Sequence, residues 1–260
     1  MITLKSPAEI ERMRKSSAIV VEALDLALSL IRPGIHTEEI DRSVAELIHS
    51  RGGRPAFKGY GGYPANICIS VDDEVVHGIP GARRLQEGEI VSVDIGVEFE
   101  GYYGDAARTW GVGEIDPDKT RLLRITRESL ELGIAQAREG NRLGDISHAI
   151  QKHVESAGYS VVRDLVGHGI GRALHESPQI PNFGAAGQGA RLKAGMVFAI
   201  EPMVNMKGYQ VKTLEDQWTV VTADGSPSAH FEHDVVITKS EPEILTNESG
   251  DYGKRSRDKN

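Results

Sequence analysis

The chain has 260 residues, a formal net charge of -8 and a single cysteine, Cys68. The acidic balance argues against a large phosphate-neutralising surface, so nucleic acid is not the expected substrate. A lone cysteine excludes an intrachain disulfide and a thiolate-cluster metal site, so a metal ion would have to be held by His, Asp or Glu. The sequence has no apolar run of ~18 residues and no signal-peptide pattern at Met1, which predicts a cytosolic protein without membrane association.

The first half is predicted to form two helices followed by strands. Ser6-Pro7-Ala8-Glu9 combines a capping box with proline at the first helical position, and this helix should stop near Arg32-Pro33-Gly34. A second helix is expected from Thr37, its N-cap, to Gly52-Gly53. Strands are expected over residues 66–71, 90–99 and 102–109, with a turn at Glu100-Gly101.

The second half is predicted to have the same order of two helices followed by strands. Asp116 with Pro117 behind it predicts the start of a long helix to Arg138, and another helix is expected from about Asp145 to Ala157. Two local patterns recur at nearly the same offset: Gly34 with Ile40 as Gly140 with Ile146, and Leu85, Gly88 and Asp94 as Leu192, Gly195 and Glu201. Generic helix-hairpin glycines are one explanation. A duplication is the other, and it would place an acidic residue at the same position in each half.

Acidic residues stand where the strand pattern requires apolar ones. Asp94 lies within Ile90-Val91-Ser92-Val93-Asp94-Ile95, where an unpaired buried carboxylate would cost several kcal/mol. If Phe99-Glu100 is the hairpin tip, Asp105 faces Asp94 across the ladder, and such like charges are destabilising without a cation. An ion pair between one carboxylate and Arg108 is the alternative. Glu201 and Glu232 hold comparable strand positions in the second half.

Three of the nine histidines stand apart from the others. His168 and His175 lie in a glycine-rich segment, and His77 precedes Gly78, whereas His36, His49, His148 and His153 are predicted to lie on the surface. The glycine-rich segment lacks the Gly-Lys-Ser/Thr of a phosphate loop. Four carboxylates with one imidazole suit manganese, iron(II), cobalt(II) or zinc, and two ions bridged by carboxylates balance the charge better than one.

Together these residues form motifs that resemble the type I methionine aminopeptidases. The motifs are Val91-Ser92-Val93-Asp94, Gly104-Asp105-Ala106-Ala107-Arg108-Thr109, Gly167-His168-Gly169-Ile170-Gly171, Ile200-Glu201-Pro202 and Glu232-His233. The resemblance runs from about residue 3 to 246 and implies an α+β pita-bread fold, with two pseudo-symmetric helix-helix-strand halves around a central antiparallel sheet. It also implies one catalytic domain over residues 1–247, with halves of about 6–112 and 116–246.

The resemblance implies a hydrolase that removes the initiator methionine from nascent polypeptides when the second residue is small. It assigns five ligands of two divalent metal ions: Asp94, Asp105, His168, Glu201 and Glu232. Glu201 would also relay the proton of the attacking water, His175 would stabilise the oxyanion, and His77 would bind the scissile amide. The methionine pocket would be formed by Phe57, Tyr60, Tyr63, Cys68, Leu174 and Trp218. Family members often carry Cys in place of Phe57 and Phe in place of Leu174, which affects the expected pocket shape.

Two other functions stay open at this point. One is an Xaa-Pro peptidase of the same fold, although the pocket residues and the absence of an additional N-terminal domain speak against it. The other is a non-catalytic pita-bread protein that binds peptides or RNA, although all five ligand positions are intact. A monomer is expected from the resemblance. Residues 248–260 are polar and are expected to be disordered, with a transient ribosome contact through their basic residues as the alternative.

Overall fold

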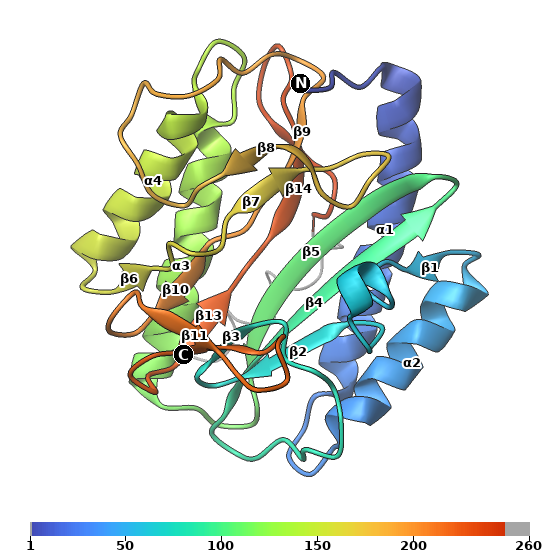
Figure 1. Ribbon diagram of the computed structural model, residues 1–260, viewed down its shortest axis with the longest axis vertical. Coiled ribbons are helices and arrows are strands. Elements are labelled where there is room, and N and C mark those ends of the chain that lie inside the picture. The colour runs from blue at the N-terminus through green and yellow to red at the C-terminus, as the bar shows by residue number, and fades with distance from the viewer. Residues whose placement is uncertain (1, 248–260) are drawn as a thin grey trace.

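The computed structural model of the protein describes residues 2–247, and its element order shows two helices followed by strands, twice over (Figure 1). The helices are α1 (Pro7–Leu30), α2 (Thr37–Ser50), α3 (Pro117–Gln136) and α4 (Leu143–Ser156), with a short 3-10 turn η1 (Tyr60–Gly62). The strands of the first half are β1 (Arg54–Pro55), β2 (Cys68–Val71), β3 (Glu74–Val76), β4 (Ile90–Phe99) and β5 (Tyr102–Gly111). Those of the second half are β6 (Ser160–Val161), β7 (Gly167–Gly169), β8 (Glu176–Ile180), β9 (Val197–Ile200), β10 (Met203–Asn205), β11 (Val211–Thr213), β12 (Val220–Thr222), β13 (Ser228–His230), β14 (His233–Val236) and β15 (Glu243–Ile244).

The helices flank the strands in two pairs. Figure 1 shows α1 and α2 on the right of the molecule and α3 and α4 on the left, with the strands between them. One antiparallel sheet has the order β1-β4-β2 with β5 paired to β4, and another has the order β15-β14-β9-β7-β8. Two three-stranded sheets, β13-β10-β6 and β11-β12-β3, complete the structure. Within residues 2–247, no helix is long and apolar enough to cross a membrane.

Each helix pair buries its apolar face against its own strands. One core cluster joins α1 and α2 to β2, β4 and β5, and another joins α3 and α4 to strands of the second half. A third cluster contains side chains of both halves, among them Met13, Tyr63, Leu174 and Val197. The candidate site is built partly from this third cluster, so the packing of the two halves determines its shape.

The same backbone hydrogen bond recurs in both halves at the positions that suggested a duplication. The N–H of Gly34 donates to the carbonyl of Leu85 (2.7 Å), and the N–H of Gly140 donates to the carbonyl of Leu192 (3.1 Å). Gly34 and Gly140 have φ values of 88° and 97°, a left-handed conformation that glycine adopts without strain. The sequence repeat is therefore also a repeat of local structure.

The start of α1 follows the prediction and the start of α2 does not. Ser6 and Glu9 form the expected capping box of α1. In α2 the N-cap is His36, and Thr37 is the first helical residue. The Thr37 hydroxyl instead exchanges hydrogen bonds with the backbone of Gly81, so a tertiary contact takes the group that was expected to cap the helix.

The register of the β4–β5 hairpin differs from the one that would set Asp94 directly opposite Asp105. The loop is Glu100-Gly101, and both residues have positive φ, as the twist of a two-residue hairpin requires. Asp94 consequently pairs with Ala107, and Asp105 pairs with Gly96. The two carboxylates lie on the same face of the ladder as diagonal neighbours, which still brings their side chains within reach of one another.

Candidate functional site

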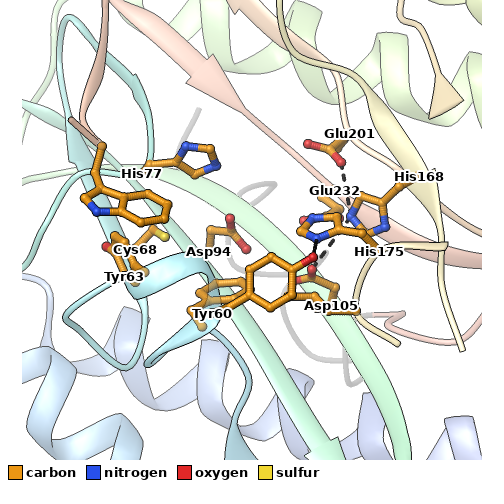
Figure 2. A pocket seen from close by; sticks show the side chains of 13 residues that line it. Tyr60, Tyr63, Cys68, His77, Asp94, Asp105, His168, His175, Glu201 and Glu232 are labelled. Atoms are coloured by element: carbon orange, nitrogen blue, oxygen red, sulfur yellow. Dashed lines mark hydrogen bonds and ion pairs between the residues drawn. The ribbon is translucent and has the colours of Figure 1, made fainter. Parts of the chain in front are cut away.

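All thirteen side chains that the sequence predicts for the site line one pocket (Figure 2). They come from both halves of the chain: Phe57, Tyr60, Tyr63, Cys68, His77, Asp94 and Asp105 from the first, and His168, Leu174, His175, Glu201, Trp218 and Glu232 from the second. One end of the pocket is aromatic and apolar, and the other carries the carboxylates. The roles assigned to the individual residues stay predictions.

Strand pairing positions the two aspartates. Asp94 lies in the middle of β4, where its Cα partner on β2 is Cys68. Asp105 lies on β5, and its backbone N–H donates to Oδ2 of Asp234 on β14 (2.9 Å). The β4–β5 hairpin is thereby joined to the second half of the chain at the site itself.

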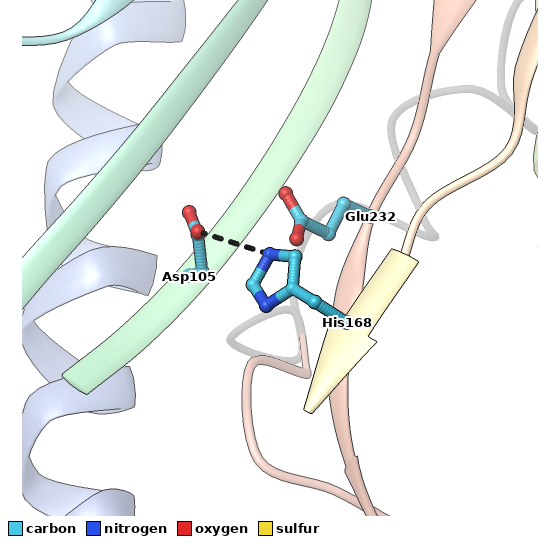
Figure 3. A group of neighbouring side chains, drawn as sticks. All are labelled: Asp105, His168 and Glu232. Atoms are coloured by element: carbon cyan, nitrogen blue, oxygen red, sulfur yellow. Dashed lines mark ion pairs between the residues drawn. The ribbon is translucent and has the colours of Figure 1, made fainter. Parts of the chain in front are cut away.

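The second half supplies an imidazole and two glutamates. Glu201 directly follows β9, and Glu232 directly precedes β14, with its backbone N–H donating to the carbonyl of Ala107 (2.9 Å). His168 Nε2 lies 3.5 Å from Oε1 of Glu201 and 4.0 Å from Oδ2 of Asp105. One ligand atom each from Asp105, His168 and Glu232 lies within 4.8 Å of the other two (Figure 3).

The tautomer of His168 suits a ligand. Its Nδ1 lies 3.0 Å from the carbonyl oxygen of Gly169, which can only accept, so Nδ1 carries the proton. The lone pair of Nε2 then faces the carboxylates. Burial, with a smaller contribution from the nearby His175, lowers the pKa of His168 to about 3, so the ring is neutral at physiological pH.

The carboxylates lie close together and are shielded from solvent. Glu232 is only 2% exposed, and one oxygen each of Asp94, Asp105 and Glu232 is buried without a hydrogen-bond partner among the described residues. Burial raises the pKa of Asp94 to about 7. Burial, together with the neighbouring carboxylates, raises the pKa values of Asp105, Glu201 and Glu232 well above their usual range. Such a set of oxygen donors with one neutral imidazole fits divalent cations, whose charge would offset this repulsion.

The apolar end is walled by aromatic rings. The ring of Trp218 meets that of Tyr63 edge-on at 5.2 Å, and Leu174 and Cys68 are buried beside them. The Tyr63 hydroxyl donates to the carbonyl of Gly78 (2.9 Å), so its ring is held in place. Burial raises the pKa of the Cys68 thiol, which makes Cys68 an inert wall of the pocket.

His77 and His175 lie between the two ends. His77 has a φ of 59°, and the backbone at the next residue is confined, because a Cβ on Gly78 would lie 2.2 Å from the carbonyl oxygen of Ile69. The ring of His175 is 4.2 Å from that of His168. Burial lowers the pKa of both His77 and His175, so both rings are neutral hydrogen-bonding groups at physiological pH.

Two residues at the site were missed by the sequence reasoning. His230 is buried, and its Nε2 lies 3.8 Å from Oε2 of Glu201. Asp234 is fully buried and accepts the Asp105 N–H. Both belong to the stretch His230-Phe231-Glu232-His233-Asp234, in which four of five residues are titratable, and this density was a usable signal.

Comparison with known proteins agrees with this geometry. Residues 11–239 match metallopeptidase family M24. A methionine aminopeptidase from Clostridium perfringens is 56% identical over 246 residues, which cover 95% of this chain and 99% of that protein. The crystal structure of a methionine aminopeptidase from Thermotoga maritima has a TM-score of 0.94 and 51% identity, covering 95% of this chain and 100% of that one.

A more distant structure shows the shared architecture alone. The prolidase from Pyrococcus furiosus is 24% identical, with a TM-score of 0.77 over 94% of this chain and 65% of its own. The expected pita-bread fold and the resemblance to methionine aminopeptidases are both confirmed by these matches.

Proposed function

The chain belongs to metallopeptidase family M24, and from this premise we propose that it removes the N-terminal methionine from polypeptides by metal-dependent hydrolysis. One observation carries the proposal: a pocket places buried carboxylate oxygens, which have no hydrogen-bond partner within residues 2–247, next to an apolar aromatic compartment. An unbranched, polarizable methionine side chain suits the apolar end. The α-amino group and the first peptide bond then lie at the carboxylate end.

Five side chains would hold the metal: Asp94, Asp105, His168, Glu201 and Glu232. The charge of four carboxylates favours two divalent ions, and the donor types suit cobalt, manganese, iron(II) or zinc. Such ions, when bound, supply positive charge at the reacting carbonyl and lower the pKa of water.

The chain's own groups would direct the proton and the developing charge. Glu201, whose pKa is raised by burial and by the carboxylates of Asp94 and Asp234, is suited to accept a proton from the attacking water and pass it to the leaving amine. The neutral His175 would donate a hydrogen bond to the developing oxyanion. His77 would hydrogen-bond the scissile amide and so hold the substrate backbone.

The substrates would be the N-termini of newly made polypeptides, and we place the reaction in the cytosol with the enzyme acting as a monomer. Lys254, Arg255, Arg257 and Lys259, to which the sequence assigns a ribosome contact as an alternative, lie outside the described residues, as does the predicted disorder of residues 248–260. The proposed activity requires neither the ribosome contact nor disorder of these residues.

A metal titration tests the proposal. Protein stripped of metal, with its absence confirmed by elemental analysis, is assayed on a Met-Ala-Ser peptide while manganese, iron(II), cobalt and zinc are added. Activity should be lost on chelation and return with at least one metal, and Asp105→Asn should lower the metal stoichiometry of the folded protein. Full activity of the stripped enzyme would contradict the proposal.

A peptide panel separates the two alternative functions. A preference for Xaa-Pro peptides over Met-Ala-Ser would favour the Xaa-Pro peptidase. Binding of peptides without hydrolysis, in the presence of every metal tested, would favour the non-catalytic protein.

A further inference from the structure

A buried ion pair lies beneath the loop that carries His175. The Lys5 ammonium is 2.6 Å from Oε2 of Glu176, and the two side chains are only 4% and 17% exposed. Lys5 belongs to the segment that precedes α1 and lies outside the residues that match the family. Its partner is the residue directly after His175.

Glu176 organises the loop between β7 and β8. Its Oε1 accepts the backbone N–H groups of Arg172 (2.8 Å) and Ala173 (3.3 Å), while Oε2 takes the Lys5 ammonium. The carboxylate therefore closes residues 171–176 into a compact turn. Leu174 and His175 project from this turn into the pocket, one at its apolar wall and the other beside His168.

The fit between Lys5 and this loop is close. A Cβ added to Gly171 would lie 2.5 Å from Cε of Lys5 and 2.7 Å from Oε1 of Glu176, so the ion pair crosses directly over the glycine. The backbone of Lys5 is itself fixed, since its N–H donates to the carbonyl of Gly195 (2.7 Å). The backbone from which the Lys5 ammonium extends is therefore held in place.

An exposed ion pair on the same loop provides a contrast. Arg172 lies 3.3 Å from Glu9, but its side chain is 68% exposed. Solvent screens such pairs, and they contribute little to position or stability. Removing one partner of a buried pair leaves an uncompensated charge, to which the surrounding backbone must adapt. The position of residues 171–176 should therefore depend on the buried Lys5–Glu176 pair more than on the exposed one.

We infer that Lys5, acting through Glu176, is a positioning residue for His175 and Leu174, so that the segment before α1 determines turnover and methionine selectivity. The inference rests on the proposed function, because His175 and Leu174 matter only where a substrate is bound there. Lys5 itself does not line the pocket.

The test compares Lys5→Met, Glu176→Gln and the double variant with the wild type. Displacement of a catalytic group by about 1 Å costs up to 10²-fold in rate, so kcat on Met-Ala-Ser should fall about 10- to 100-fold in each single variant. The double variant should lose no more than either single one, because both remove the same link. Lys5→Arg should restore most of the turnover, and metal content should stay at the wild-type value because residues 171–176 contain no proposed ligand.

A matched control is Lys119→Met, which removes a second lysine–carboxylate pair with the same separation of 2.6 Å, that between Lys119 and Asp72. Its kcat should equal that of the wild type. Glu176→Gln keeps an acceptor for the backbone N–H groups, so this variant can test the link between Lys5 and Glu176 if Lys5→Met does not fold.

Hydrogen exchange gives a readout that is independent of activity. The amides of Arg172 and Ala173 should exchange faster in Lys5→Met than in the wild type. Wild-type kcat and unchanged exchange in folded Lys5→Met would overturn the inference, as would a lowered Tm with unchanged kcat, because the pair would then be merely structural. An inactive wild type would count against the proposed function, and the exchange rates would still decide whether Lys5 orders the loop.

Discussion

The hydroxyl of Tyr60 lies 2.7 Å from Nδ1 of His175, which is 115 residues away in the chain. Tyr60 opens η1 and is 46% exposed, whereas His175 belongs to the loop before β8, so the contact joins the two halves at the mouth of the pocket. When the hydroxyl donates to Nδ1, the proton of the neutral ring resides on Nε2. That tautomer is the one that can donate a hydrogen bond to a developing oxyanion.

Tyr60→Phe should therefore lower kcat while KM changes less. A single hydrogen bond contributes about 0.5–1.5 kcal/mol, so the expected loss is about 2- to 12-fold. The phenyl ring keeps the wall of the pocket. Tyr209→Phe, at another partly exposed tyrosine that does not line the pocket, is the control and should leave kcat unchanged. An equal fall in the two variants would count against the proposed contact.

The chemistry of the site was predictable from the sequence because its acidic residues violate the strand pattern. Asp94 interrupts an apolar run, and Glu201 repeats the violation at the equivalent position of the second half. The structure places both in one pocket. An acidic residue in a buried strand is costly enough to mark a site before any coordinates are known.

Register and long-range contacts were not predictable in the same way. The diagonal placement of Asp94 and Asp105 depends on which two residues form the hairpin loop, and a shift of one residue at the tip changes every pair. His230 approaches Glu201 only because β10 and β13 pair. The Thr37 hydroxyl donates a hydrogen bond to the carbonyl of Gly81, which is 44 residues away in the chain. Local capping rules consider only neighbouring residues and so do not predict this contact.

Glu201→Gln should lose at least ~10²-fold in kcat, because positioned proton transfer contributes about 10² to 10⁴-fold and the amide cannot accept the proton. The measurement uses metal-replete protein with its metal content checked by elemental analysis. Glu215→Gln is an exposed control with the same chemical change and should be indistinguishable from the wild type. A near-normal kcat in metal-replete Glu201→Gln would remove this role from Glu201.

The capping box of α1 predicts a pH dependence of stability that is separate from the metal site. Hydrogen bonds from the Ser6 backbone and hydroxyl, and from Tyr102, lower the pKa of Glu9 to about 2. A carboxylate whose pKa is depressed in the folded state adds stability above its unfolded pKa, about 4.5, and this is lost as the pH falls through about 2. Glu9→Gln should thus lower Tm slightly at pH 7, by an amount that shrinks between about pH 4.5 and 2.

The Glu9 side chain is 28% exposed, so solvent still screens its charge, and the effect should be no more than the roughly 0.3–1 kcal/mol typical of charges at helix N-termini. Glu11→Gln, at an exposed position of the same helix, is the control. A difference between Glu9→Gln and wild type that stays constant from pH 7 to pH 2 would show that the charge of Glu9 has no part in it.

Steric access at His77 and His175 predicts the specificity for the second residue of the substrate. Both rings line the pocket, and the backbone at His77 is confined on one side by the contact of Gly78 with Ile69. A large second side chain could be accommodated only by moving the groups that hold the scissile bond, and such displacement costs rate steeply. Peptides beginning Met-Gly, Met-Ala or Met-Ser should be cleaved, and Met-Leu, Met-Ile and Met-Lys should be slower by about 100-fold in kcat/KM. The six peptides are compared at one metal concentration, with Leu-Ala-Ser as the control for the first position. Cleavage of Met-Leu as fast as Met-Ala would refute the steric argument, because the same rigid backbone would then have admitted a side chain for which it leaves no room.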